Sequence, residues 1–387
     1  MNPKPDETTG LFDEQFRRDP HAYWSNLRAQ SPVAWSERLD AWLVMSHSAA
    51  LTALHDKRLT MDVYSAFRPS PIPVRSSFEM EPEENAQFRR AVAPHLRTIA
   101  RDTRQVEAVA LALARQIDDS RQWDLAADFA EPLAHRLVRH WLGLTPDSHL
   151  QLLHLLDKAD QVEDPSYRAA AGEIATELLL TEIVTARNSG SQTLLARLAR
   201  AWPEWGGKDA DLAAFVSPMT FSLVKGIGTR LLVHSVAALC LQPALQRVVQ
   251  DGGFNLAERV AEEASRWEPV QQAIPRRASN HMELEGRHVA RGERLLIVLS
   301  AVCRDPAQHP EPHRFDPFRT EPSLAFGHGS HGCLGGGLAT AATAVALVVL
   351  LRTVRGPLRP AQLPSDVPQV GLGLAYTSLW LQARTSA

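Results

Sequence analysis

Apolar residues recur at a helical period of three to four residues through most of the middle of the chain. The segments with this period are predicted to be helices, and they cover residues 85–100, 103–117, 132–144, 171–187, 209–241 and 255–269. A further apolar run from Leu338 to Leu351 is predicted to be a buried helix, because it is too short to cross a membrane. Helices are therefore expected to dominate from about residue 80 to residue 270.

Strand patterns gather near the two ends of the chain. A helix over 19–30 leads into a strand at 31–35, a second strand is predicted at 41–47, and a helix follows over 48–56. Short strands are predicted over 281–302 and again at the C-terminal end.

The stretch from Thr60 to Met80 is rich in proline and has no helical period, which predicts a long loop of the kind that often carries function. With no repeat and no linker, the chain is expected to form one domain over 1–387 of mainly α, minor β (α+β) class. Its helix-rich portion is about 80–270, and its β-containing portions are about 30–60 and 270–387.

Composition narrows the function classes. The 387 residues are 44% hydrophobic and 22% charged, with a formal net charge of −3, so no electrostatic argument favours nucleic acid or an anionic membrane as a partner. The first residues have no apolar core typical of a signal peptide. We therefore expect a cytoplasmic protein with no membrane association and reduced cysteines, and its scarcity of lysine suggests a bacterial origin.

Cys333 is the cysteine with unusual surroundings. Cys240 and Cys303 lie in apolar segments and are predicted to be buried, and no C-x-x-C pair suggests a zinc site. Cys333 lies in the segment FGHGSHGCLGGG, whose glycines allow the backbone to approach a flat ligand closely. The helix that follows directs its positive end at the sulfur and favours a thiolate. A thiol nucleophile and a phosphate-binding loop are the alternatives, but a sulfur wrapped by glycines suits metal ligation better.

The same loop resembles the heme-binding signature of the cytochrome P450 family. The pattern reads Phe326-x-x-Gly329-x-His331-x-Cys333-x-Gly335. The resemblance implies that Cys333 ligates the iron of heme b as a thiolate. The neighbouring residues implied to contact the cofactor are Phe326, Gly327, His331 and Gly335.

Other segments follow in the order found in that family. EEASRW supplies a structural Glu263 and Arg266 pair, and the resemblance implies that Arg314, in HPEPHRFDPFR, locks onto it. Arg276 and Arg89 match the arginines that contact the heme propionates, while Asn85 stands where a histidine is common.

The resemblance carries further expectations of fold and chemistry. It implies a triangular prism of helices around a buried heme, and a monooxygenase that uses O₂ and electrons from NAD(P)H. The electrons are expected from a ferredoxin and a ferredoxin reductase, and the substrate is expected to be a small molecule of bacterial secondary metabolism. A monomer is expected. The substrate pocket is expected to be lined by residues 60–80, 223–227, 272–274 and 375–378.

The central helix departs from the family pattern, which places an acid and an alcohol over the heme. Counted without a gap from Pro243, the five distal positions are Leu223, Val224, Lys225, Gly226 and Ile227, so that Gly226 replaces the acid and Ile227 the alcohol. A shift of two residues would instead place Thr229 at the alcohol position. The gapless register is preferred because it forms a continuous apolar stripe. In either register the carboxylate is missing.

Three functions remain compatible with these changes. The first is a monooxygenase that obtains protons from water or from a substrate group. The second is a heme-thiolate enzyme of oxidative coupling, dehydrogenation or peroxide-driven oxidation. The third is a non-catalytic scaffold, which the intact cysteine loop disfavours. The first is preferred by a small margin.

Overall fold

The computed structural model describes residues 4–61, 82–118, 120–162, 164–354, 356–361, 369–370, 372–374 and 378–382. Most of the long loop expected at 60–80 and most of the turn expected at 375–378 lie outside these residues. The statements below concern the described part of the chain.

The helices lie where the apolar period predicts them, over most of the middle of the chain. The α-helices are α1 (Glu14–Arg18), α2 (Pro20–Gln30), α3 (His47–His55), α5 (Pro82–Arg101), α6 (Arg104–Ala114), α7 (Glu131–Leu142), α8 (Pro146–Gln161), α9 (Pro165–Asn188), α10 (Leu194–Ala201), α11 (Asp209–Leu223), α12 (Leu232–Cys240), α13 (Pro243–Trp267), α14 (Leu299–Val302) and α15 (Gly336–Thr353). Two 3₁₀ turns are η2 (Trp202–Trp205) and η4 (Gly329–His331), and two π-helical segments are η1 (Ala126–Ala130) and η3 (Val224–Leu231).

The strands form one larger sheet and three small pairs. The five-stranded sheet has the order β1 (Val33–Ser36), β2 (Ala41–Val44), β8 (Arg294–Val298), β5 (Ala273–Ala278) and β3 (Leu59–Thr60). The pairs are β4 (Trp123–Asp124) with β11 (Trp380–Leu381), β6 (Met282–Leu284) with β7 (Arg287–Val289), and β9 (Gln369–Val370) with β10 (Gly373–Leu374). Only β2 and β8 pair in parallel within the larger sheet. The mainly α, minor β class expected from the sequence is confirmed.

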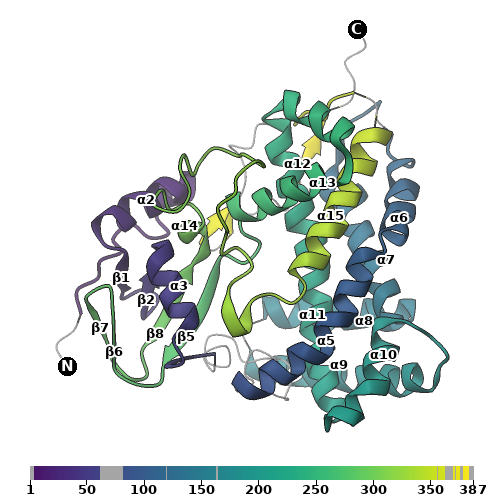
Figure 1. Cartoon of the computed structure of the whole chain (residues 1–387), viewed down its shortest axis with the longest axis horizontal. Coiled ribbons are helices and arrows are strands. Elements are labelled where there is room, and N and C mark those ends of the chain that lie inside the picture. The colour runs from purple at the N-terminus through teal and green to yellow at the C-terminus, as the bar shows by residue number, and fades with distance from the viewer. Residues whose placement is uncertain are drawn as a thin grey trace.

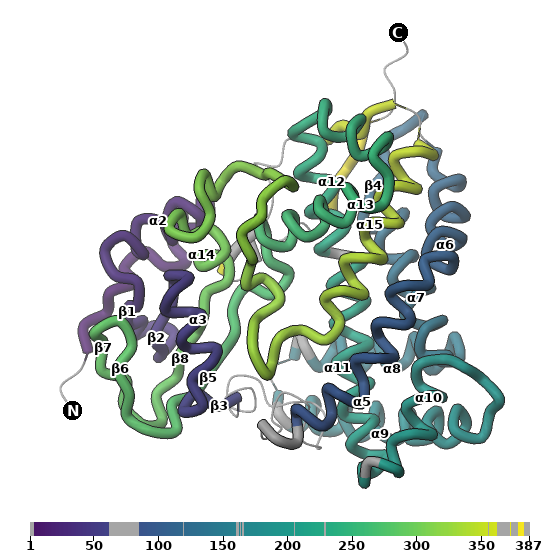
Figure 2. Tube along the Cα trace, in the orientation of Figure 1, coloured from purple at the N-terminus to yellow at the C-terminus, as the bar shows by residue number. Residues whose placement is uncertain are grey.

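The five-stranded sheet and most of the helices lie on opposite sides of the molecule. Figures 1 and 2 show the five-stranded sheet with α2 and α3 on one side and the helices α5 to α11 on the other, with the segment that leads into α15 running between them. α15 packs against α13, α6 and α5, so the end of the cysteine loop is anchored in the helical core. This arrangement places the loop at the junction of the two sides.

The central helix is interrupted where a single long helix was predicted. α11 ends at Leu223, the π-helical η3 follows, and α12 begins at Leu232. A π-helical turn shifts the backbone hydrogen bonds by one residue and occurs mostly at functional sites. The interruption carries Gly226, which lines the cavity described below.

Two helical stretches are long and apolar enough to cross a membrane, Asp209–Cys240 and Gly336–Thr353. Their apolar windows are 88% and 78% buried inside the protein. Both are core helices in this fold, since their apolar surfaces are covered by neighbouring elements.

Candidate functional site

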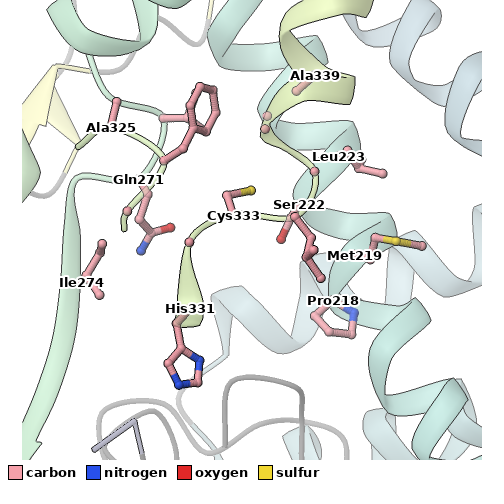
Figure 3. Close-up of a pocket in the computed structure, with 18 of the residues that line it drawn as sticks. Pro218, Met219, Ser222, Leu223, Gln271, Ile274, Ala325, His331, Cys333 and Ala339 are labelled. Carbon is pink, nitrogen blue, oxygen red and sulfur yellow. The ribbon is translucent and has the colours of Figure 1, made fainter. Parts of the chain in front are cut away.

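A cavity of about 270 Å³ lies between the two sides of the molecule, with Cys333 in its wall. One wall comes from α5 and from the central helix, another from β5 and the segment before it, and the floor from the cysteine loop. Figure 3 shows Cys333 between Gln271 on one side and Ser222 and Leu223 on the other. Most of the lining side chains are apolar, as is usual for a site that binds a small organic molecule.

The backbone of the loop is held in a fixed turn. The Cys333 N–H donates a hydrogen bond of 2.7 Å to the Phe326 carbonyl. Gly327 and Gly329 adopt φ angles of 69° and 71°, a region that other residues rarely occupy. A Cβ added to Gly336 would lie 3.1 Å from the ring of Phe326, so a glycine is needed for this ring to pack on the start of α15.

The Cys333 thiol is reached from the cavity, although protein surrounds it on its other sides. Burial raises the pKa of this thiol, and this effect outweighs the backbone hydrogen bonds from Gly335 and Gly336 and the charge of Arg89, which lower it. The expectation that the helix end alone favours a thiolate is therefore incomplete. The free thiol is therefore expected to keep its proton at neutral pH, and a metal that binds the sulfur would displace that proton. Cys240 and Cys303 are buried as expected, and burial raises their pKa values to about 12 and about 11.

Basic side chains flank the loop at the cavity wall. Arg89 Nη1 donates to the Gly332 carbonyl at 2.6 Å. Arg276 is buried in β5, where Nη1 donates to the Pro275 carbonyl at 2.9 Å and contacts the Met61 sulfur. Burial, together with the charges of Arg276 and Arg89, lowers the pKa of His331 to about 4. The structure therefore brings Arg89, Arg276 and His331 to the same cavity as Cys333.

The central helix contributes a narrow strip of its surface. Met219, Ser222, Leu223 and Gly226 line the cavity, at the spacing of one helical face. Val224 and Ile227 are buried in the core and do not line it.

Gly226, the acid position of the gapless register, lines the cavity, whereas Ile227, its alcohol position, does not, and the register stays a prediction. Lys225 lies near the surface and pairs with Asp157 at 3.2 Å, away from the cavity. The side chain of Thr229 lies outside the described residues. Of the other expected pocket segments, 272–274 contributes Ile274, and the adjacent Gln271 joins it.

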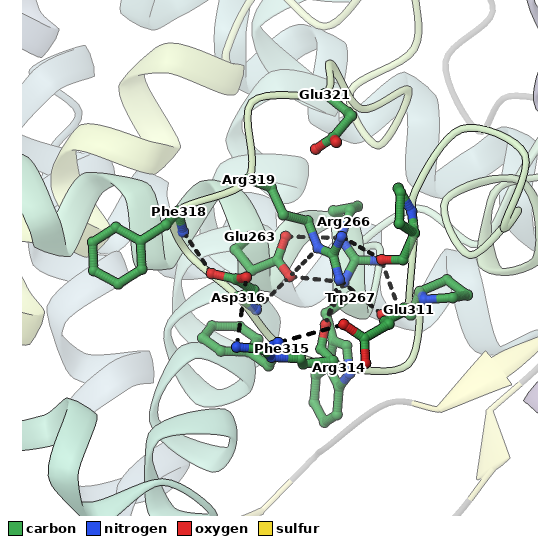
Figure 4. Close-up of polar contacts among 12 residues, drawn as sticks. Glu263, Arg266, Trp267, Glu311, Arg314, Phe315, Asp316, Phe318, Arg319 and Glu321 are labelled. Atoms are coloured by element: carbon green, nitrogen blue, oxygen red, sulfur yellow. Dashed lines mark hydrogen bonds and ion pairs between the residues drawn. The ribbon is translucent and has the colours of Figure 1, made fainter.

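A buried charge cluster connects α13 with the segment that precedes the cysteine loop (Figure 4). Arg266 donates to both carboxylate oxygens of Glu263, each at 2.7 Å, as the sequence suggests. The prediction that Arg314 is the third member of this cluster is wrong, because its side chain is 63% exposed and pairs with Glu311 at 3.4 Å. Arg319 takes this place, with its Nε 3.3 Å from Glu263 Oε1 and a side chain that is 10% exposed.

Several residues of the site were not singled out from the sequence. Asn85, noted only as a substitution, donates to the Ser330 carbonyl at 2.7 Å and so ties α5 to the cysteine loop. Ser222 shares the i, i+3, i+4, i+7 spacing of the cavity strip, and that pattern is the signal that could have identified it. Gln271 directly precedes the predicted pocket segment, so the expected boundary was one residue short.

Comparisons with known proteins agree with this geometry. Residues 254–374 match the family model described as Cytochrome P450. The chain is 27% identical to the cytochrome P450 monooxygenase PikC of Streptomyces venezuelae, over 88% of this chain and 85% of that protein. It is 28% identical to the 6-deoxyerythronolide B hydroxylase of Saccharopolyspora erythraea, over 88% and 90% respectively.

A solved structure extends the likeness to the whole fold. The cytochrome P450 enzyme CxnD, for C–S bond formation in chuangxinmycin biosynthesis, superposes with a TM-score of 0.85 and 22% sequence identity, over 98% of each chain. The family match covers the second part of α13, β5, the proline-rich segment 305–321 and the cysteine loop, and of these β5 and the cysteine loop line the cavity. The chain is therefore similar to the cytochrome P450 family, in sequence over 88% of its length and in fold over 98%.

Proposed function

We propose that this protein is a heme-thiolate monooxygenase that oxidises a small natural-product-like molecule in the bacterial cytoplasm, acting as a monomer with a ferredoxin and a ferredoxin reductase. The observation that carries the proposal is the Cys333 thiol, which faces an apolar cavity from a rigid glycine-rich loop. PikC is a monooxygenase by name and the relative from Saccharopolyspora erythraea is a hydroxylase by name, and they support a related role for this chain.

The residues around the cavity fit heme b, the cofactor that the family implies. Cys333 offers one sulfur whose raised pKa calls for a cation in place of its proton. Arg89 and Arg276 supply positive charge beside the loop, which suits the two propionates, and Phe326 covers the apolar side. Bound heme would supply an iron that activates O₂ with electrons from NAD(P)H, while the protein's own residues would hold the heme and orient the substrate.

Proton supply is the step for which this chain lacks the usual residues. Gly226 has no side chain and Ile227 is buried in the core, so neither donates a proton into the cavity. Lys225 pairs with Asp157 near the surface. We infer that protons come from ordered water or from a polar group of the substrate. The same observation favours a second candidate, a heme-thiolate enzyme that couples, dehydrogenates or uses peroxide without this proton supply.

The two candidates differ in how tightly NADPH consumption is coupled to product. The variant Gly226→Glu with Ile227→Thr restores the acid and the alcohol in the gapless register. The added acid would face the cavity, because Gly226 lines it and a Cβ there would meet only Val270, at 3.9 Å, whereas residue 227 lies in the core. Positioned proton transfer typically contributes about 10²–10⁴-fold. We therefore expect the variant to raise the ratio of product to NADPH consumed and to lower hydrogen peroxide release.

A matched control carries similar bulk but no exchangeable proton. Gly226→Leu with Ile227→Val should leave the coupling ratio of the wild type unchanged or lower it. Product formation by the wild type with hydrogen peroxide alone, combined with no gain in coupling in the restored variant, would favour the second candidate. Tight coupling in the wild type with a substrate that has no polar group would contradict our account of proton supply.

A further inference from the structure

The polar side chains that line the cavity fall into two groups. Apart from the Cys333 thiol, they are Asn85, Arg89, Ser222, Gln271, Arg276 and His331. Four of them bond to the cavity wall itself. Asn85 contacts Ser330 and His331, Arg89 contacts Gly332, and Arg276 contacts Pro275. Ser222 and Gln271 form the second group. Each has a polar atom that can form a hydrogen bond with a molecule in the cavity.

Ser222 differs from the other hydroxyl residues of α11 and α12 near it: Ser217 also has no partner, but it is buried in the core and does not face the cavity. Thr220 and Ser235 donate to the carbonyls four residues earlier, each at 2.7 Å, which is the usual way to satisfy a helical hydroxyl. Ser222 makes no such bond among the described residues, and its side chain is exposed to the cavity. Its hydroxyl is thus free to donate to a ligand, one helical turn before Gly226.

Gln271 presents the complementary group from the opposite wall. Its Nε2 donates to the Ala273 carbonyl at 2.9 Å, which fixes the amide and leaves the Oε1 oxygen as an acceptor. Figure 3 shows the Gln271 amide and the Ser222 hydroxyl on the two sides of Cys333. A donor and an acceptor therefore face the same space from elements far apart in the sequence.

We propose that Ser222 and Gln271 are the hydrogen-bonding anchors of the substrate, and that the substrate is an apolar molecule carrying at least one hydroxyl group near the oxidised position. A hydroxyl can accept from Ser222 or donate to Gln271 Oε1, whereas a hydrocarbon leaves both groups desolvated without a partner. The anchored hydroxyl also places an exchangeable proton beside Gly226, where the protein has none. This inference rests on the proposed function and specifies its substrate class.

The test measures the binding of matched pairs that differ in one hydroxyl. The probes are linalool with 3,7-dimethylocta-1,6-diene, 1-adamantanol with adamantane, and 1-decanol with decane, titrated by calorimetry into the heme-loaded protein. We expect the wild type to bind at least one alcohol about tenfold more tightly than its hydrocarbon, which is the effect of about one or two neutral hydrogen bonds. Ser222→Ala and Gln271→Leu should each lower this preference several-fold.

Two control variants separate hydrogen bonding from shape. Ser222→Thr keeps the hydroxyl and should keep the preference. Met219→Leu changes the cavity surface without a polar group and should alter the affinities for alcohol and hydrocarbon alike. The proposal is overturned if no pair shows a preference in the wild type, or if Ser222→Ala and Gln271→Leu both retain it. The proposed function is judged separately, because its failure appears as a reduced carbonyl complex without the thiolate-type Soret band.

Discussion

Replacing Arg266 with alanine should destabilise the protein more than any other single change in the charge cluster of Glu263, Arg266 and Arg319. Arg266 is 2% exposed, and its guanidinium group donates to both oxygens of Glu263. It also donates to the Cys303 and Pro312 carbonyls, each at 2.9 Å. Its loss leaves a buried carboxylate and two buried carbonyls without their donor.

The loss of stability in Arg266→Ala depends on the partners that Glu263 keeps. Removing one member of a buried ion pair costs about 3–5 kcal/mol. Arg319, at 3.3 Å, and the Asp316 N–H, at 2.8 Å, still contact Glu263 Oε1, so the lower half of this range applies. Unfolding entropy is about 2.1 cal/mol/K per residue, so a loss of about 4 kcal/mol lowers the melting temperature of 387 residues by roughly 5 °C.

The chain offers matched variants for this prediction. Arg319→Ala removes a contact to Glu263 and also the donors to the Pro310 and Glu311 carbonyls, at 2.6 and 2.8 Å. Its cost should be intermediate, since these partners lie nearer the surface. Arg314→Ala removes an exposed side chain whose pair with Glu311 is worth at most about 1 kcal/mol.

The assay combines thermal unfolding, followed by circular dichroism, with the heme content of each purified variant. The expected order of stability is wild type, then Arg314→Ala close to it, then Arg319→Ala, then Arg266→Ala, and heme content should fall in the same order. An Arg314→Ala variant less stable than Arg319→Ala would refute our assignment of the cluster. A fully stable and heme-loaded Arg266→Ala would refute the argument from buried charge.

Two further predictions concern the cavity floor and the response to acid. Cys333→Ala should abolish the red-shifted Soret band of the reduced carbonyl complex, whereas Cys240→Ala and Cys303→Ala should retain it; the absence of that band in the wild type would contradict heme ligation by Cys333. Burial, reinforced by the charge of Arg266, lowers the pKa of His309 to about 4 from 6.5. The unfolded chain therefore binds more protons between these values, and stability should fall as the pH drops from 6.5 to 4, by roughly 3 kcal/mol for this residue. His309→Leu should remove that part of the loss in urea titrations at pH 7 and pH 5, and an unchanged acid response would show that His309 is not its source.

The helices that were predicted have both a period and an end, whereas α8 and α10 were not among the predicted segments. A Gly253 with φ of 68° separates the two halves of α13, so the predicted helix over 255–269 begins where the backbone resumes its regular course. The π-helical η3 was not predictable, because it differs from an α-helix by a shift of one hydrogen bond. The central helix is apolar on nearly all sides, so its composition does not mark the shift.

The cluster beneath the cavity shows a different limit of sequence reasoning. Arg314 and Arg319 lie five residues apart in a proline-rich segment without regular structure, so no period indicates which of them faces Glu263. The direction of each side chain depends on how that segment folds over α13. The Phe318 ring, next to Arg319, is 57% exposed, so hydrophobicity is also a poor guide to direction here.

The cysteine loop and the central helix, which face each other across the cavity, are constrained by different physical requirements. The floor must hold Cys333 in one position, and it does so with positive-φ glycines, the Phe326 ring on Gly336 and the tie from Asn85. The central helix at Gly226 is not closely packed, because a Cβ there would meet only Val270 at 3.9 Å. Substitutions at Gly226 should therefore change proton supply and ligand preference while leaving cofactor binding intact, whereas Leu223 of the same strip is more constrained, because a Cβ at Gly335 of the cysteine loop would lie 3.4 Å from it. We therefore expect the position of Gly226 to vary more freely than the cysteine loop opposite it.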